Sequence, residues 1–196
     1  RSLEILRQPL EDKVIRISRV YGTYDFPADF MLCAAMNPCP CGHYPDMNRC
    51  RCTPAQVMQY LGRISQPLLD RLDLCAEVSP VDFEGLSSGR KGESTQTIRE
   101  RVICAQDIQR ERYKIEGIQF NGELSGAQIE KYCKMEKDAR QLLKMAFQNM
   151  PFSARAYHRI LKVARTIADM EATESIHRHH IAEALSYRAF DKKYWN

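Results

Sequence analysis

A stretch rich in glycine and serine, residues 85–94, divides this chain of 196 residues into two portions of different character. The stretch has almost no apolar side chains, so we predict a linker there. Before it, short apolar runs alternate with turn residues, which is typical of mixed strands and helices. After it, apolar residues recur at helical spacing. The sequence therefore predicts an α/β portion over residues 1–84 and an all-α bundle over residues 95–196.

The first portion is predicted to contain strands and short helices. Alternating apolar side chains around a Tyr-Gly-Thr turn predict a β-hairpin over residues 13–26. The continuous apolar run of residues 31–36 is typical of a central strand that is buried on both faces of a parallel sheet. The other predicted elements are a helix over residues 2–8 that Pro9 ends, a helix over residues 54–64 with Thr53 as its cap, and a short strand over residues 75–78.

The second portion is predicted to consist of helices. The most regular apolar face belongs to residues 153–170, where apolar side chains recur at intervals of three and four. Ser125 and Gln128 have the spacing of a capping box, which marks the start of another helix. The remaining helices are predicted over residues 95–113, around residues 139–147 and over residues 178–189.

Composition indicates a cytoplasmic protein and leaves its partner open. The net charge of +4 is too small to indicate nucleic acid by itself. No apolar run approaches the roughly 20 residues that a membrane span needs, and no secretory leader precedes the first predicted helix. We therefore expect no membrane partner and a reducing cytosol, where clustered cysteines indicate a metal more often than disulfides.

Four of the eight cysteines fall within fourteen residues, in a loop predicted over residues 38–53. They form two Cys-X-Cys arms, and two thiolates from each arm can meet one tetrahedral zinc ion. The arms are tighter than the usual two-residue gap, so free thiols and a redox disulfide stay open as alternatives. His43 is a possible substitute ligand. Because four cysteine ligands leave no open position, the zinc would be structural. The four candidates are Cys39, Cys41, Cys50 and Cys52.

Three further positions could meet a phosphate group. Asn37 follows the predicted buried strand, where α/β sheets bind ligands, although an Asn-Pro turn is the commoner meaning of the local sequence. Arg71 lies among carboxylates in residues 63–73, either held ready for a phosphate across an interface or engaged in surface ion pairs. Arg155 lies in the first turn of a predicted helix, where it either faces an anion or is solvated.

Other patterns that carry chemistry are missing from the sequence. The best match to a phosphate-binding loop, residues 85–92, fails because position 90 is arginine and Lys91 precedes a glycine. No apolar strand ends in the Asp-Glu pair that would hold magnesium, and no catalytic triad is recognisable. Three histidines near the last helix lack an acidic or cysteine partner at a suitable spacing, so we interpret them as capping and surface residues. They are His177, His179 and His180.

Taken in order, these segments resemble the magnesium-chelatase-like AAA+ ATPases of bacteria, the YifB/ComM family. The resemblance covers nearly the whole chain. More distantly, the order of hairpin, asparagine, Leu-Arg-Asp and helical lid is similar to the MCM helicases. The segments that carry the resemblance are residues 7–12 (RQPLED), 35–42 (AMNPCPCG), 63–65 (RIS), 67–73 (PLLDRLD), 153–169 (SARAYHRILKVARTIAD) and 183–188 (EALSYR).

The resemblance implies a fold. Residues 1–84 would be the C-terminal part of an AAA+ core with an inserted cysteine-rich loop, and residues 95–196 would be its helical lid. The hairpin would face the pore of a hexameric ring, where Arg16 or Arg19 could touch DNA.

The resemblance also implies catalytic roles. Asn37 would be the sensor 1 residue, which positions the attacking water. Arg71 would be an arginine finger, presented to ATP on the neighbouring subunit, where it stabilises charge on the transferring phosphoryl group. Arg155 would be sensor 2, which reads the nucleotide from the lid. ATP with magnesium would be the cofactor of the full-length protein.

The function implied is a ring-forming motor that acts on DNA, of the branch-migration type linked to natural transformation. Two alternatives remain open. One is a chelatase-type motor that acts on a protein or metal-insertion partner. The other is a zinc-stabilised module that binds nucleic acid without ATP.

The chain opens with Arg1 rather than methionine, and we expect the phosphate-binding loop and the magnesium-holding strand upstream of it. The full-length protein is then expected to be an ATPase. The chain by itself is expected to bind ATP weakly or not at all, and not to hydrolyse it, because it lacks the loop that cradles the phosphates. A nucleotide titration measures this, and an affinity in the micromolar range would contradict it.

Overall fold

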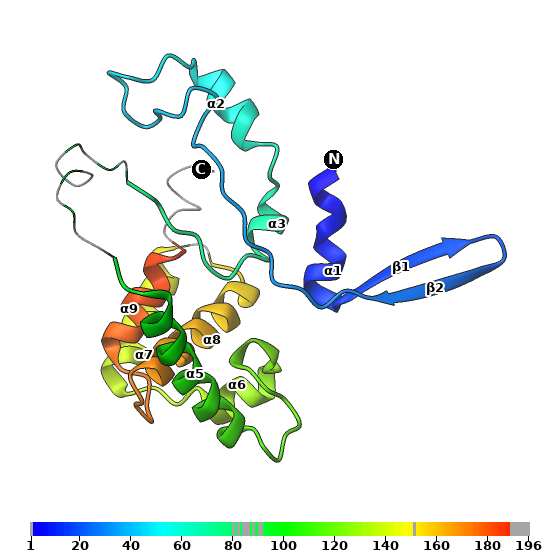
Figure 1. The fold of residues 1–196 in the computed structure, drawn as a ribbon, viewed down its shortest axis with the longest axis vertical. Helices are drawn as coiled ribbons and strands as arrows, with labels where there is room; N and C mark the ends of the chain where they lie inside the picture. The colour runs from blue at the N-terminus through cyan, green and yellow to red at the C-terminus, as the bar shows by residue number, and fades with distance from the viewer. Residues whose placement is uncertain are drawn as a thin grey trace. The chain divides into compact units, whose positions relative to one another are not determined.

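The computed structural model describes residues 2–79, 81, 83, 87, 89, 92–150 and 152–188 (Figure 1). The described residues form two compact units, one ending at Leu72 and the other spanning Asp73–Arg188. Most of the linker predicted over residues 85–94 lies outside the described residues, as do position 189 of the last predicted helix and everything after it.

The first unit combines short helices with a two-stranded antiparallel sheet. Its elements are the 3-10 helix η1 (Ser2–Leu6), the helix α1 (Arg7–Asp12), the strands β1 (Val14–Arg19) and β2 (Gly22–Pro27), and the helices α2 (Pro54–Leu61) and α3 (Gln66–Leu69). Pro9 was predicted to end a helix, and this is wrong. It lies in the first turn of α1, where backbone N–H groups have no partner within the helix, so the missing N–H costs nothing.

The predicted hairpin is confirmed. Register pairs Ile15 with Phe26 and Ile17 with Tyr24, which puts these four side chains on one face of the ribbon. The opposite face carries the pair Arg16 and Asp25. The ribbon is therefore amphipathic, with its apolar face accessible to solvent.

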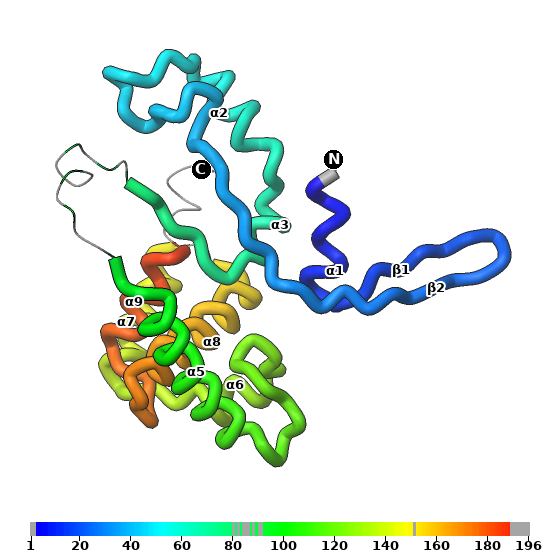
Figure 2. The backbone as a smooth tube through the Cα atoms, in the orientation of Figure 1, coloured from blue at the N-terminus to red at the C-terminus, as the bar shows by residue number. Residues whose placement is uncertain are grey.

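The central strand predicted over residues 31–36 is wrong. No strand forms there, and the side chains of Met31 and Met36 are 92% and 44% exposed. Figure 2 shows the segment as an extended trace between β2 and the loop that precedes α2. Within the described residues β1 and β2 are the only strands that form a sheet, so the apolar run has no neighbouring strand to complete a ladder. The strand predicted over residues 75–78 is wrong for the same reason, although the N–H of Cys75 donates to the carbonyl of Tyr187.

The second unit is a helical bundle, as the sequence predicts. Helix α8 lies at its centre and contacts α5, α6 and α9. Its apolar face buries residues such as Ile160, Leu161 and Ala164. Among the described helices, none is both long and apolar enough to cross a bilayer. The elements are α5 (Thr95–Arg112), η2 (Asn121–Glu123), α6 (Gly126–Tyr132), α7 (Lys137–Asn149), α8 (Ala154–Met170) and α9 (Arg178–Ser186).

A buried carboxylate ties the helices of this unit together. The side chain of Asp169 is fully buried and accepts hydrogen bonds from Arg112 at 2.9 Å, from Arg165 at 3.1 Å and from the amide of Asn121 at 2.9 Å. Arg165, itself buried, also donates to the carbonyls of Thr173 and Glu174. One carboxylate thus pairs with two guanidinium groups and joins α5, η2 and α8.

We predict that Asp169→Asn lowers the free energy of unfolding of the helical unit by about 3–5 kcal/mol, because the buried guanidinium of Arg165 and the partly buried one of Arg112 lose their counter-charge. Urea denaturation followed by far-UV circular dichroism measures the change. Asp107→Asn is the matched control, since Asp107 pairs with Arg110 on the exposed surface of α5 and its loss should cost less than about 1 kcal/mol. Equal midpoints for the Asp169 variant and the wild type would contradict the role of this carboxylate.

Candidate metal centre

The structure brings the four predicted cysteines to one point. Their sulfur atoms all lie within 4.8 Å of one another, and no other His, Asp or Glu of the described residues joins this group. The Sγ of Cys39 is 3.4 Å from that of Cys41 and 3.8 Å from that of Cys50, and Cys41 and Cys50 are 3.6 Å apart. His43, the possible substitute ligand, lies outside the group.

Local structure explains why the sulfurs converge. Gly42 has a positive φ of 81°, and its N–H donates to the carbonyl of Cys39 at 3.1 Å, so the first arm turns back sharply. The N–H of Cys50 donates to the carbonyl of Asp46 at 2.8 Å, which closes the second turn. Directly after Cys52, Thr53 caps α2 as predicted, with its hydroxyl accepting the N–H of Gln56 at 3.3 Å.

The loop packs against α2. Cys39 is fully buried and forms a small apolar cluster with Val57 and Leu61 of that helix. The other three cysteines lie around this cluster and are partly exposed. The cluster is too small to order a loop of this length by burial alone.

Backbone donors make part of the site suited to thiolates. The N–H groups of His43 and Arg51 lower the pKa of Cys41 to about 6. Burial and the neighbouring thiols raise the pKa of Cys52 to about 12. The four groups therefore cannot all ionise near neutral pH unless a cation joins them.

The geometry fits zinc. Four sulfurs at about 2.3 Å from a tetrahedral zinc ion are about 3.8 Å from one another. The three separations among Cys39, Cys41 and Cys50, 3.4–3.8 Å, approach this value. They are far from the length of about 2.05 Å of a disulfide bond, and all four cysteines are free thiols. Four sulfur ligands would leave no position for substrate, so the centre would be structural.

The three histidines were predicted to be capping and surface residues without an acidic partner, which is partly wrong. His180 is fully buried, and Glu171 accepts from its Nε2 at 3.0 Å and from Nε2 of His179 at 2.9 Å. The capping role is confirmed, because Nδ1 of His180 accepts the N–H of His177 at 3.0 Å. Glu171 was missed because it belongs to the end of the preceding helix.

This histidine cluster does not fit a metal as it is arranged. A neutral imidazole carries one proton, and Nδ1 of His180 accepts a hydrogen bond. The proton must then sit on Nε2, which donates to Glu171 and has no lone pair to offer. The two hydrogen bonds also lower the pKa of Glu171, with His179 making the larger contribution.

The residues predicted to face a nucleotide occupy varied surroundings. Asn37 is exposed and lies beside Gly42. Arg155 is exposed in the first turn of α8, whose cap is Ser153. Arg71, in contrast, has a side chain only 11% exposed. Its guanidinium pairs with Glu11 and donates to the carbonyl of Pro67 at 2.7 Å.

The two hairpin arginines differ from one another. Arg16 forms a two-pronged pair with Asp25, at 2.7 and 2.8 Å, and its hydrogen bonds lower the pKa of that carboxyl group. Arg19 ends β1 and is exposed. It adjoins Val20 and Tyr21, which are 96% and 97% exposed at the tip of the hairpin.

Comparison with known sequences assigns the chain to a family. Residues 1–86 match the family described as magnesium chelatase, subunit ChlI, and residues 92–188 match magnesium chelatase, subunit ChlI C-terminal. The chain is also 45% identical to the protein YifB of Salmonella typhimurium over 194 residues, which are 98% of this chain and 37% of YifB. It belongs to the magnesium-chelatase-like YifB/ComM family.

Other relatives extend the same relationship within the YifB/ComM family. Competence protein ComM of Haemophilus influenzae is 45% identical over 188 residues, which are 95% of this chain and 36% of ComM. YifB of Escherichia coli is 42% identical over 194 residues, which are 98% of this chain and 37% of that protein. The chain thus spans a little over a third of the length of these relatives.

We predict that this YifB/ComM family member binds one zinc ion per chain, and that Cys50→Ser lowers zinc affinity at least tenfold, because it removes one of four thiolate ligands. Lowering the pH should release the metal, since each ligand thiolate then regains a proton. Elemental analysis after gel filtration and release to a chromogenic chelator measure both effects.

Cys33→Ser is the matched control, since Cys33 is an exposed cysteine of the same unit outside the cluster. It should keep the zinc content of the wild type. Equal zinc retention by the Cys50 and Cys33 variants would exclude the four-cysteine centre.

Proposed function

We propose that this chain is part of an AAA+ ATPase that assembles into a ring and acts on DNA. The observation that carries the proposal is the 45% identity to a competence protein, ComM, along 95% of the chain. We infer DNA as the substrate because competence is the uptake of DNA. The proposed cofactor of the full-length protein is ATP with magnesium, and we propose the cytoplasm as its compartment.

Three residues would act on the nucleotide. We assign Asn37 to orienting the attacking water, Arg71 to stabilising charge on the phosphoryl group bound by a neighbouring subunit, and Arg155 to sensing the nucleotide from the helical unit. The exposed positions of Asn37 and Arg155 suit these roles. Asn37 follows an extended segment, and Arg155 extends from the first turn of α8, where the helix dipole favours an anion.

Arg71 needs a change of partner to act across an interface. In the chain by itself, its guanidinium is paired with Glu11. A triphosphate offers more negative charge than one carboxylate, and guanidinium binds both in the same two-pronged geometry. We therefore propose that nucleotide on the neighbouring subunit draws Arg71 away from Glu11.

The hairpin would contact DNA in the ring. Arg19 is the stronger candidate, because the charge of Arg16 is already neutralised by Asp25. The exposed ring of Tyr21 adds a surface on which a base could stack. The proposed zinc ion would hold the loop of residues 38–53 and take no part in hydrolysis.

A second candidate function is a chelatase-type motor that acts on a protein or metal-insertion partner. The family descriptions, which name a magnesium chelatase subunit, favour it. It shares the ATP chemistry and needs no DNA. Binding of DNA that weakens steeply with salt would distinguish the two functions, because phosphate contacts release counterions. We place it second because the name of the relative ComM, a competence protein, refers to a process and favours DNA.

We predict that Arg71→Ala lowers the ATPase rate of the full-length protein by about 10³-fold or more, since an arginine finger contributes at that scale. A coupled ATPase assay with and without DNA measures the rate. Arg101→Ala is the control, because Arg101 forms an exposed ion pair with Glu93 in the helical unit. The fold is checked by circular dichroism.

A subunit-mixing assay sharpens the test. Arg71→Ala subunits should regain activity when mixed with subunits that carry an intact Arg71 and a disabled phosphate-binding loop, because the finger acts on its neighbour. An ATPase rate of the Arg71 variant equal to that of the control would exclude the finger role.

A further inference from the structure

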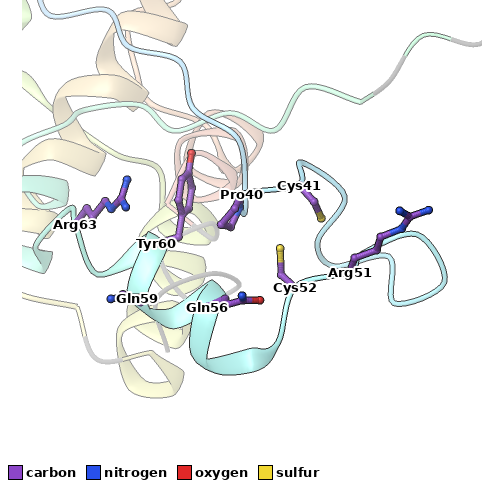
Figure 3. Close-up of a pocket in the computed structure, with 8 residues that line it drawn as sticks. All are labelled: Pro40, Cys41, Arg51, Cys52, Gln56, Gln59, Tyr60 and Arg63. Carbon is purple, nitrogen blue, oxygen red and sulfur yellow. The ribbon is translucent and has the colours of Figure 1, made fainter.

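Two hollows flank the cysteine loop in the first unit. The larger, of about 490 Å³, lies between the loop and α2 and is drawn in Figure 3. The second, of about 450 Å³, lies along the loop itself, and the two share Cys41 and Arg51. The larger is lined by Pro40, Cys41, Arg51, Cys52, Gln56, Gln59, Tyr60 and Arg63. The smaller is lined by Cys41, His43, Asn48, Arg49 and Arg51.

The charged side chains of these walls are all arginines, which donate hydrogen bonds and accept none. Three arginines line the hollows, and no carboxylate of the described residues does. None of the three forms an ion pair with a described residue. Asp46, the carboxylate of the loop, is outside both walls, and it accepts the N–H of Asn48 at 3.0 Å. The guanidinium groups of Arg49, Arg51 and Arg63 are therefore available to an external anion.

An aromatic ring lies among these donors. Arg51 and Arg63 occupy opposite ends of the larger hollow, with Tyr60 and Pro40 between them (Figure 3). The guanidinium of Arg63 lies 5.6 Å from the centre of the Tyr60 ring. The ring is partly exposed. The hollow thus offers cations at both ends and an apolar ring beside one of them.

The charge balance stays positive when zinc is bound. Zinc with four thiolates carries a net charge of about −2. The three arginines of the walls exceed this charge. The side chain of Arg51 also extends beyond the sulfurs, so an anion that approaches this end of the hollow meets a guanidinium group first (Figure 3).

We propose that this surface, formed by Arg49, Arg51, Tyr60 and Arg63, binds single-stranded DNA. The guanidinium groups contact successive phosphates, and a base stacks on the ring of Tyr60. Arg51 lines both hollows, with Arg63 in one and Arg49 in the other. A polymer with repeated phosphates can contact all three arginines, whereas a single phosphate cannot. A single strand suits the surface better than a duplex, since only an unpaired base exposes a face to the ring. This inference deepens the proposed action on DNA and rests on it.

The test uses the zinc-loaded full-length protein and a fluorescently labelled oligothymidylate, with anisotropy as the readout. Arg51→Ala/Arg63→Ala should weaken binding at least tenfold. It should also reduce the slope of log affinity against log salt by about 1.4, since each phosphate contact on a single strand contributes about 0.7. Tyr60→Leu should weaken binding about tenfold and leave the salt slope unchanged, because stacking releases no counterions.

Matched controls separate this surface from general charge and from folding. Arg101→Ala/Arg110→Ala removes two exposed arginines of α5 and should keep wild-type affinity and slope. Zinc content must stay at the wild-type value in every variant, which shows that the loop is intact. DNA-independent ATPase activity should be unchanged in all of them.

The outcomes are distinguishable. If the Arg51/Arg63 variant binds the oligothymidylate as tightly as the wild type while DNA still stimulates the ATPase, the surface is not the DNA contact and the proposed function stands. If the wild type neither binds DNA nor responds to it, the inference and the DNA function both fail. If the variant loses binding to a polyglutamate probe and keeps DNA binding, the surface serves an acidic protein and the inference is overturned.

Discussion

Hydrophobic burial in the first unit is too small to order the cysteine loop, which would depend on the proposed zinc ion as a cross-link. Around the cysteine loop only Cys39, Val57 and Leu61 are buried among the described residues, which is little apolar area for a segment that contains two reversals of direction. Convergence of four sulfurs gives the loop a second source of order. The shape of the two hollows and the spacing of their arginines follow from that convergence, since Arg51 lies between two of the ligand cysteines.

The second unit relies on a different principle. Its core is extensive, and at its centre Asp169 holds two guanidinium groups from different helices. The helix that carries this buried pair also presents Arg155 at its exposed start. The role that we propose for Arg155, sensing a nucleotide, requires a rigid support, because the position of the guanidinium is then fixed before the nucleotide binds. The interior of the bundle thus fixes the backbone from which Arg155 extends.

Sequence was informative wherever the deciding interaction is local. The hairpin and the capped starts of α2 and α6 were predictable, because turn residues and caps act within four positions. The cysteine cluster was predictable because its members lie within fourteen residues. Pairing between segments that are distant in the sequence was not predictable. The apolar run of residues 31–36 specifies no neighbour, and Glu11 lies sixty positions from Arg71.

Cys52 and Thr53 are neighbours in the sequence, and this couples metal binding to the structure of α2. A candidate metal ligand and a helix cap are adjacent residues, so ordering of the loop and formation of the start of α2 are coupled. Any molecule that prefers the ordered arrangement raises the affinity for metal, and metal raises the affinity for that molecule by the same factor, because linkage is reciprocal. When metal is scarce, the surface that includes α2 would then bind its ligand with lower affinity.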